Sequence, residues 1–283
     1  GPRTETERNM SISRRTAIKT VIATTVGSAT AGLTYGAAFE RHRIGMTSTA
    51  LPVAGLPPAL DGLRISLITD IHHSRIVPAG DVVQAIKLAM SARPDLIVLG
   101  GDYVTFGDRA FVGPVAELLG SLQAPHGVFA VLGNHDDDRD MAAALAAKQF
   151  TVLKDQRTQV TIRNETLTLA GIRFWTRRAE NIARVVNGAE GTVLLLAHDP
   201  RRLVEAANLK LPAVLSGHTH GGQIILPGVG AIARRSFPVL SGLGQQGDTS
   251  IFVSRGVGTI YVPVRINCPP EVALLTLRRP AHA

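Results

Sequence analysis

The chain of 283 residues has a single cysteine, Cys268, and few aromatic side chains, which make up 4% of the sequence. One cysteine excludes a disulfide bond within the chain and a zinc site built from several thiolates. We therefore interpret Cys268 as a packed thiol. Because aromatic residues are scarce and no recognisable reader module is present, the sequence gives no support for specific nucleic-acid binding.

Acidic residues are also in the minority. The chain has 22 Asp and Glu against 30 Lys and Arg, a formal net charge of +8. A basic surface favours anionic partners such as phosphate esters or an anionic membrane, although several of the arginines belong to the N-terminal tail. With 45% hydrophobic residues, the length suits one large α/β domain or two small ones.

Charged residues are missing from the segment Thr20 to Phe39, which follows the pair Arg14 and Arg15. The run Ser13 to Lys19 resembles a twin-arginine export signal, except that Ala17 stands where Phe is usual. We expect an exported protein, periplasmic or on the outer face of the cytoplasmic membrane, that uses the twin-arginine route. A Sec-type signal or an uncleaved membrane anchor is the alternative, because about 20 apolar residues can span a bilayer.

The rest of the chain divides by composition. The nine residues before Met10 are read as upstream or added residues, and prolines after the signal indicate a spacer. The predicted segments are upstream residues 1–9, a signal or anchor at 10–39, a Pro-rich spacer at 40–62, a folded domain at 63–278 and a tail at 279–283.

Four short apolar runs each end in polar residues: "RISLITDIHH", "DLIVLGGD", "GVFAVLGNHDD" and "TVLLLAHDP". Such runs are typical of strands buried on both faces. Helical patterns lie between the first three, and 32 residues separate Asp70 from Asp102 and Asp102 from Asn134, about the size of a βαβ unit. Alternation over residues 157–174 predicts a hairpin in a second, partly antiparallel sheet. The fold class is α/β.

Polar side chains with metal-binding atoms follow these runs. Because the ends of parallel strands open on one edge of a sheet, we expect them to converge there. Within Asp-x-His and His-x-His, extended backbone would point both side chains the same way. Seven nitrogen or oxygen donors without a thiolate suit two first-row metal ions if one carboxylate bridges them, and such sites hydrolyse phosphoesters. The candidate ligands are Asp70, His72, Asp102, Asn134, His198, His218 and His220.

These motifs, with Gly-Asn-His-Asp at residues 133–136 and Gly-His-Thr-His at 217–220, resemble the calcineurin-like metallophosphoesterases in type and order. The resemblance extends from Leu63 to about Leu277. The stretches "SGHTHGGQIILP" and "FVSRGVG…VPVRINCPPEVALLTL" are similar to a bacterial branch of exported or membrane-tethered phosphodiesterases.

The resemblance implies a four-layer α/β/β/α sandwich with the site at the C-terminal edge of its strands. It implies two metal ions, of which Mn, Fe and Zn are candidates, with a hydroxide between them that attacks phosphorus. His135 would protonate the leaving oxygen or stabilise charge on the phosphoryl group. The first ion would be held by Asp70, His72, Asp102 and His220, and the second by Asp102, Asn134, His198 and His218.

The predicted function is metal-dependent phosphodiester hydrolysis, with a lipid or an envelope polymer as candidate substrates and a membrane contact through the N-terminal segment. A pyrophosphatase acting on a nucleotide-linked lipid of the UDP-diacylglucosamine type is one alternative. A non-catalytic metal-dependent binding protein is another, disfavoured because His135 and all seven donors are present. Substrate contacts stay open, and His73, Arg234 and Arg235 are candidates.

Overall fold

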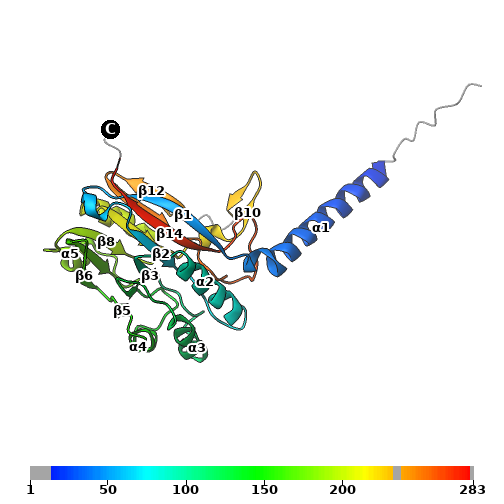
Figure 1. Ribbon diagram of the computed structural model, residues 1–283. Helices are drawn as coiled ribbons and strands as arrows, with labels where there is room; N and C mark the ends of the chain where they lie inside the picture. The colour runs from blue at the N-terminus through cyan, green and yellow to red at the C-terminus, as the bar shows by residue number, and fades with distance from the viewer. Residues whose placement is uncertain (1–13, 232–236, 281–283) are drawn as a thin grey trace, which may run out of the picture.

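The computed structural model describes residues 14–231 and 237–280. Two six-stranded sheets lie against each other, with helices on their outer faces (Figure 1). In order across the first sheet, the strands are β1 Gly45–Pro52, β14 Glu271–Arg278, β2 Arg64–Ile68, β3 Leu96–Leu99, β4 Val128–Ala130 and β5 Thr151–Val152. Across the second they are β12 Gly242–Gln246, β13 Thr249–Val253, β9 Ala213–Ser216, β8 Thr192–Leu196, β7 Glu165–Gly171 and β6 Gln156–Ile162.

Three apolar cores hold these layers together. The side chains of one core fill the space between the sheets, and they include Leu67 and Val98 from the first sheet and Leu169 and Leu194 from the second. A second core joins the first sheet to the helices α2 Ala79–Ser91, α3 Arg109–Leu119 and α4 Asp140–Ala146. A third joins the second sheet to α5 Ala179–Val186 and α6 Leu203–Asn208. The predicted four-layer α/β/β/α sandwich is confirmed.

Strand direction sets the position of the site. Strands β2 to β5 are mutually parallel, and so are β7, β8, β9 and β13. The predicted hairpin is confirmed, since β6 pairs antiparallel with β7 across Ile162 and Glu165. Short elements complete the chain: the 3-10 turns η1 Glu40–His42, η2 Pro58–Leu60, η3 Pro200–Arg202 and η4 His220–Gly222, and the small hairpin strands β10 Ile225–Leu226 and β11 Gly230–Ala231.

The segment predicted as a spacer contributes to the fold instead. Residues 45–52 form β1, which pairs in parallel with β14 along its whole length, and Leu51, Leu56 and Leu60 are buried. The predictions of a spacer at 40–62 and of a domain that begins near residue 63 are therefore wrong. Most of β1 is exposed or half-buried at a sheet edge, where polar residues and a terminal Pro52 are tolerated.

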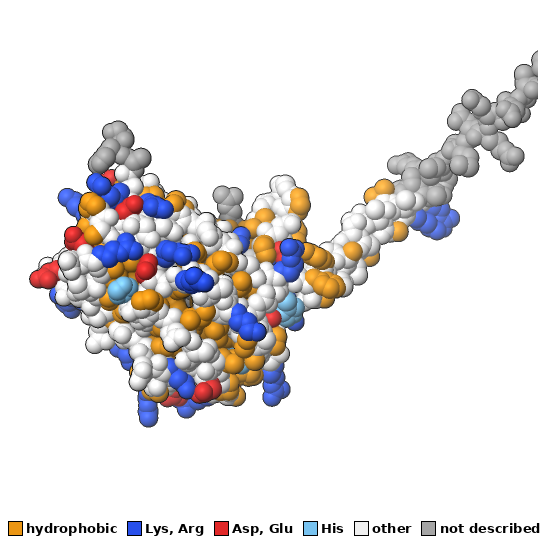
Figure 2. All heavy atoms as spheres, viewed as in Figure 1, with side chains coloured by type: hydrophobic (Ala, Val, Ile, Leu, Met, Phe, Trp, Pro, Cys, Tyr) orange, Lys and Arg blue, Asp and Glu red, His pale blue; other side chains and the backbone are white. Residues whose placement is uncertain are grey.

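Helix α1, Arg14–Ala38, extends away from the sandwich (Figures 1 and 2). Its C-terminal end is attached to the body, because Gly36 accepts a hydrogen bond from the backbone of Arg265 at 3.2 Å and Arg43 donates to the hydroxyl of Tyr35 at 3.0 Å. Among residues 14–231 and 237–280, no helix combines the length and the apolar character needed to cross a bilayer. Residues 1–13, and with them the first part of the predicted signal, lie outside the described residues.

Candidate metal centre

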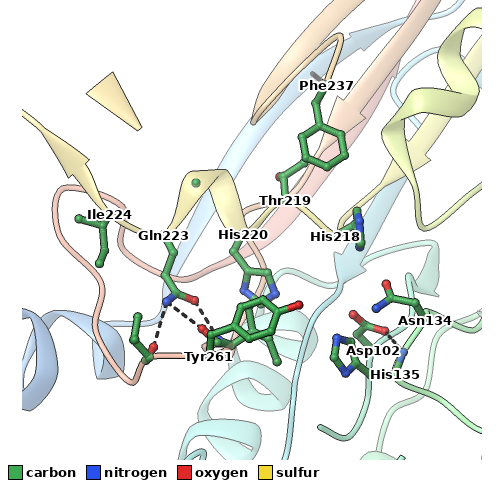
Figure 3. Close-up of a pocket in the computed structure, with 13 residues that line it drawn as sticks. Asp102, Asn134, His135, His218, Thr219, His220, Gln223, Ile224, Phe237 and Tyr261 are labelled. Atoms are coloured by element: carbon green, nitrogen blue, oxygen red, sulfur yellow. Dashed lines mark hydrogen bonds between the residues drawn. The ribbon is translucent and has the colours of Figure 1, made fainter. Parts of the chain in front are cut away.

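The structure brings all seven predicted donors to the C-terminal edge of the two sheets. The pair Asp70 and His72 follows β2, Asp102 follows β3, and Asn134 follows β4. From the second sheet, His198 follows β8, and both His218 and His220 follow β9. Figure 3 shows Asp102, Asn134, His135 and His218 around one end of a shared pocket.

One cluster consists of Asp70, His72 and His220, whose donor atoms all lie within 4.8 Å of one another. The Nε2 atoms of His72 and His220 are 3.1 Å apart, and Nε2 of His220 is 3.5 Å from Oδ1 of Asp70. All three side chains are buried. Two imidazoles and one carboxylate in this arrangement suit a first-row divalent ion.

The second cluster consists of Asp102, His198 and His218, again with donor atoms within 4.8 Å of one another. Nδ1 of His198 lies 2.7 Å from the carbonyl oxygen of Gly100. Because a carbonyl only accepts, Nδ1 carries a hydrogen, so Nε2 is the nitrogen that would bind an ion once it has lost its own proton. That atom lies 3.1 Å from Oδ2 of Asp102, close enough for both to bind one ion.

Asp102 links the two clusters. Its Oδ2 atom is 3.1 Å from Nε2 of His198 in the second cluster and 3.5 Å from Nε2 of His72 in the first. The backbone N–H of His135 donates to its other oxygen, Oδ1, at 2.9 Å. A carboxylate between two donor sets can serve as a bridge between two ions.

A buried oxygen atom without a hydrogen-bond partner indicates whether these residues fit a metal ion. Oδ1 of Asn134 is buried without a hydrogen-bond partner in the described part of the chain. Leaving such an atom unsatisfied costs about 1–3 kcal/mol. This amide oxygen offers lone pairs, so a bound cation would satisfy it, and the donor set therefore fits a metal centre.

Burial keeps most of the imidazoles neutral. It lowers the pKa of His72 to about 4 and the pKa of His218 to about 3, and it moves the pKa of His220 in the same direction. Neutral imidazole is the form that binds metal. These three histidines therefore need to lose no proton before they bind an ion at neutral pH.

Two neighbouring carboxylates raise the pKa of His198. Burial alone would lower its pKa, but the charges of Asp102 and Asp70 and the carbonyl of Gly100 raise it to about 10. Burial likewise opposes ionisation of Asp102, yet His198 and His72 bring its pKa below the usual value. The metal-free cluster thus contains an imidazolium beside a carboxylate, and a metal ion would replace that proton.

The donors are carried on strained backbone. Asp70, His72, Asp102, His218 and His220 have φ values of 52°, 49°, 57°, 73° and 51°, in the left-handed region that non-glycine residues seldom adopt. The side chains within each pair therefore converge through tight turns, and the expectation of extended backbone there is wrong. The neighbouring backbone packs tightly against these carboxylates. A Cβ atom on Gly133 would collide with the carboxylate of Asp102, and one on Gly217 would collide with that of Asp70.

Asp136 holds this backbone in place through hydrogen bonds. Its carboxylate accepts hydrogen bonds from the backbone N–H groups of Asp102, Tyr103 and Gly133 at 2.7, 2.8 and 2.8 Å. It therefore fixes the turn that carries the Asp102 carboxylate, and these hydrogen bonds all come from the backbone. Asp199, by contrast, begins η3 and forms an ion pair with Arg201.

His135 lies beside the donors, and its ring lines the pocket. Nδ1 accepts a hydrogen bond from the backbone N–H of Phe106 at 3.0 Å. The neutral ring therefore carries its proton on Nε2, on the opposite side. Burial lowers the pKa of His135, which favours this neutral form.

Of the three candidates for substrate contacts, only His73 lies among the described residues. His73 is buried outside the pocket lining: Nδ1 contacts the carbonyl oxygen of Val77 at 2.9 Å and the ring packs edge-on against Phe111. Arg234 and Arg235 lie outside the described residues. The pocket has a volume of about 310 Å³. The sequence reasoning missed part of its lining, namely Gln223, Ile224, Phe237, Ile260, Tyr261 and Val262.

Comparison with known proteins agrees with this geometry. Residues 63–222 match the calcineurin-like phosphoesterase family. The phosphodiesterase YaeI of Escherichia coli is 32% identical over 76% of this chain and 82% of its own. The uncharacterized metallophosphoesterase YkuE of Bacillus subtilis is 31% identical over 94% of this chain and 98% of its own. The chain belongs to the calcineurin-like phosphoesterase family, and its activity is metal-dependent phosphoester hydrolysis.

Proposed function

We propose that the protein hydrolyses phosphodiesters with two metal ions. The observation that carries the proposal is the pair of buried donor clusters that meet at Asp102, next to His135, in one pocket. The first ion would be held by Asp70, His72, Asp102 and His220, and the second by Asp102, Asn134, His198 and His218. When bound, the ions would supply an activated water and neutralise phosphate charge.

The chain's own side chains supply the remaining interactions. His135, with its Nε2 proton, would donate a hydrogen bond to a phosphoryl or leaving oxygen, because its Nδ1 is already occupied by Phe106. Asp136 would keep the Asp102 carboxylate in place through the backbone. Catalysis of this type depends on donors that are already oriented toward the charge that develops.

Charge at the pocket supports a diester over a monoester. None of the described lining residues is Lys or Arg, and much of the lining is apolar. A monoester dianion would benefit from further cations, whereas a diester carries one negative charge and a second organic group. The name of one relative, the phosphodiesterase YaeI, points the same way.

The test uses metal-free protein reloaded separately with Mn²⁺, Fe²⁺ or Zn²⁺. Bis(p-nitrophenyl) phosphate should be cleaved only after loading, and with higher kcat/KM than p-nitrophenyl phosphate. A nucleotide-diphosphate sugar tests the pyrophosphatase alternative, and preference for it would replace our proposal. Metal binding without turnover of any ester would support the binding-protein alternative.

We propose further that the protein works outside the cytoplasm at the membrane surface. In support, α1 carries exposed apolar side chains, among them Val21, Ile22 and Val26. Replacement of Arg14 and Arg15 by lysine should retain the protein in the cytoplasm, whereas the control Lys19→Arg should be exported. Normal export of the double variant would refute the twin-arginine route.

A shortened protein tests the membrane contact. It should begin at Thr34, because removal of β1 or of the contacts at Gly36 would damage the fold. Both forms should cleave a soluble diester equally, and only the full chain should act efficiently on anionic phospholipid vesicles. Equal rates on vesicles would refute a role for α1 beyond export.

A further inference from the structure

Large apolar side chains gather at the mouth of the pocket, outside the donor clusters. Tyr261 is 80% exposed, Phe106 66% and Val262 45%. The ring of Phe106 lies 4.8 Å from that of His135 and 6.0 Å from that of Tyr261, between centroids. The exposed group therefore begins directly at the proposed catalytic histidine.

The backbone conformation and the exposure of Phe106 and Tyr261 do not stabilise the folded chain. Phe106 and Tyr261 have φ values of 50° and 62°, which strain the backbone of a bulky residue. Neither side chain gains burial in return. Strain of this kind is concentrated at ligand-contacting positions, and an apolar ligand would cover both rings.

Ile260, Tyr261 and Val262 form one wall of the pocket, and the side chain of Gln223 holds this wall in place. The side-chain amide of Gln223 donates to the carbonyl oxygens of Ile260 and Val262 at 3.1 and 2.9 Å and accepts from the N–H of Ile260 at 2.9 Å. Since Gln223 comes three residues after His220, the wall has a fixed relation to the metal-binding turn. A preformed surface binds a ligand with a small entropic cost.

The wall is also stabilised from behind. The guanidinium of Arg265 is fully buried and donates to the carbonyl oxygens of Arg255, Gly256, Gly258 and Cys268. These bonds close the base of the segment whose tip is Tyr261. The exposed aromatic ring is therefore carried on a loop whose base is anchored by a buried guanidinium.

We propose that Phe106, Ile260, Tyr261 and Val262 form a subsite for an apolar arm of the phosphodiester, aliphatic or aromatic. This rests on the proposed function and names the substrate class. The arm would lie over Phe106, next to the oxygen that His135 contacts. The continuity of this surface with the donor clusters, and the lack of Lys and Arg among the described lining residues, support an uncharged arm over a charged one.

The experiment measures binding, independently of turnover. Metal-loaded full-length protein is titrated by calorimetry with dimethyl-, butyl(methyl)-, hexyl(methyl)- and phenyl(methyl)phosphinate, which carry one negative charge, as a diester does, and are not hydrolysed. The dissociation constant should fall about threefold to fourfold for each added methylene, as expected for transfer of that group out of water. The alkyl series represents a lipid-like arm, and phenyl(methyl)phosphinate represents an aromatic one.

Variants locate the effect. Tyr261→Ser and Phe106→Ser should flatten the dependence on chain length, whereas Val204→Ser, an exposed apolar position on α6, should keep it. Equal affinity for all phosphinates in the unaltered protein would overturn the subsite, and so would an undiminished dependence in both variants. Hydrolysis of bis(p-nitrophenyl) phosphate without any chain-length dependence would leave the proposed function intact and refute only the subsite. Failure to cleave any diester, together with a clear dependence of affinity on chain length, would refute the proposed function and leave the apolar subsite intact.

Discussion

Replacement of His135 tests the chemistry most directly. The sequence left two roles open, protonation of the leaving oxygen and stabilisation of phosphoryl charge. The hydrogen bond from the N–H of Phe106 to Nδ1 favours the second, because a neutral ring that lost its Nε2 proton would become an imidazolate. His135→Ala should keep its metals and lose about 10²–10³-fold in kcat, the usual effect of removing one preorganised donor.

A second variant separates the two roles. Glutamine can donate a hydrogen bond but cannot transfer a proton at neutral pH. His135→Gln should therefore recover about tenfold of the lost rate, equivalent to a hydrogen bond of about 1.4 kcal/mol to a charged oxygen. Both variants should lose similar factors on diesters with good and poor leaving groups. His126→Ala is the matched control, because His126 precedes β4 at its other end.

The pH profile gives an independent readout. Burial lowers the pKa of His135, so the neutral form predominates at neutral pH, and activity that needs it should fall as pH decreases through that lowered pKa. A protonated general acid would show the opposite limb, with activity lost as pH rises. Our reasoning is refuted if glutamine gives no recovery and the loss is confined to poor leaving groups.

Three further predictions concern the metal centre. Asp102→Asn should lose both metals by elemental analysis together with nearly all activity, whereas the exposed control Asp248→Asn should keep them; two retained metals would exclude the bridge. Loading of metal-free protein at pH 8 should release about one proton, because the pKa of His198 is raised to about 10 and the ion replaces its proton; calorimetry in buffers of different ionisation enthalpy measures this, and affinity should increase with pH up to that value. Gly133→Ala should cost about 1–3 kcal/mol of stability by denaturant unfolding and weaken metal binding, because its Cβ meets the Asp102 carboxylate, whereas Gly113→Ala has open space and should do neither.

The layers of the fold were predictable where a strand is buried on both faces. The runs that became β2, β3, β4 and β8 are continuously apolar because each is enclosed by a helix layer and the opposite sheet. Strand β1 lacked this signal. It lies at a sheet edge, its middle residues are the polar run Thr-Ser-Thr, and its pairing partner β14 is more than 200 residues away in sequence.

The chemistry of the site was predictable because it depends on residue types that carry it wherever they stand. Aspartate, asparagine and histidine after strand ends indicate a metal centre, and the structure brings all seven together. The apolar wall could not be predicted in the same way. Phe106 and Tyr261 are ordinary hydrophobic residues in the sequence, and only the fold shows that they are exposed and contact each other beside His135.

Backbone strain explains why the donors follow the strands rather than lie within them. Five of the seven have positive φ, at about 1–3 kcal/mol each, which together approaches the entire stability of a typical domain, about 5–15 kcal/mol. Such turns persist only where their surroundings determine them. Buried strands hold them on one side, and Gly133, Gly217 and Gly256 admit the carboxylates on the other, since a Cβ atom at any of these positions would strike Asp70 or Asp102. The glycines beside the histidines and carboxylates are thus part of the metal centre, although they donate no ligand atom.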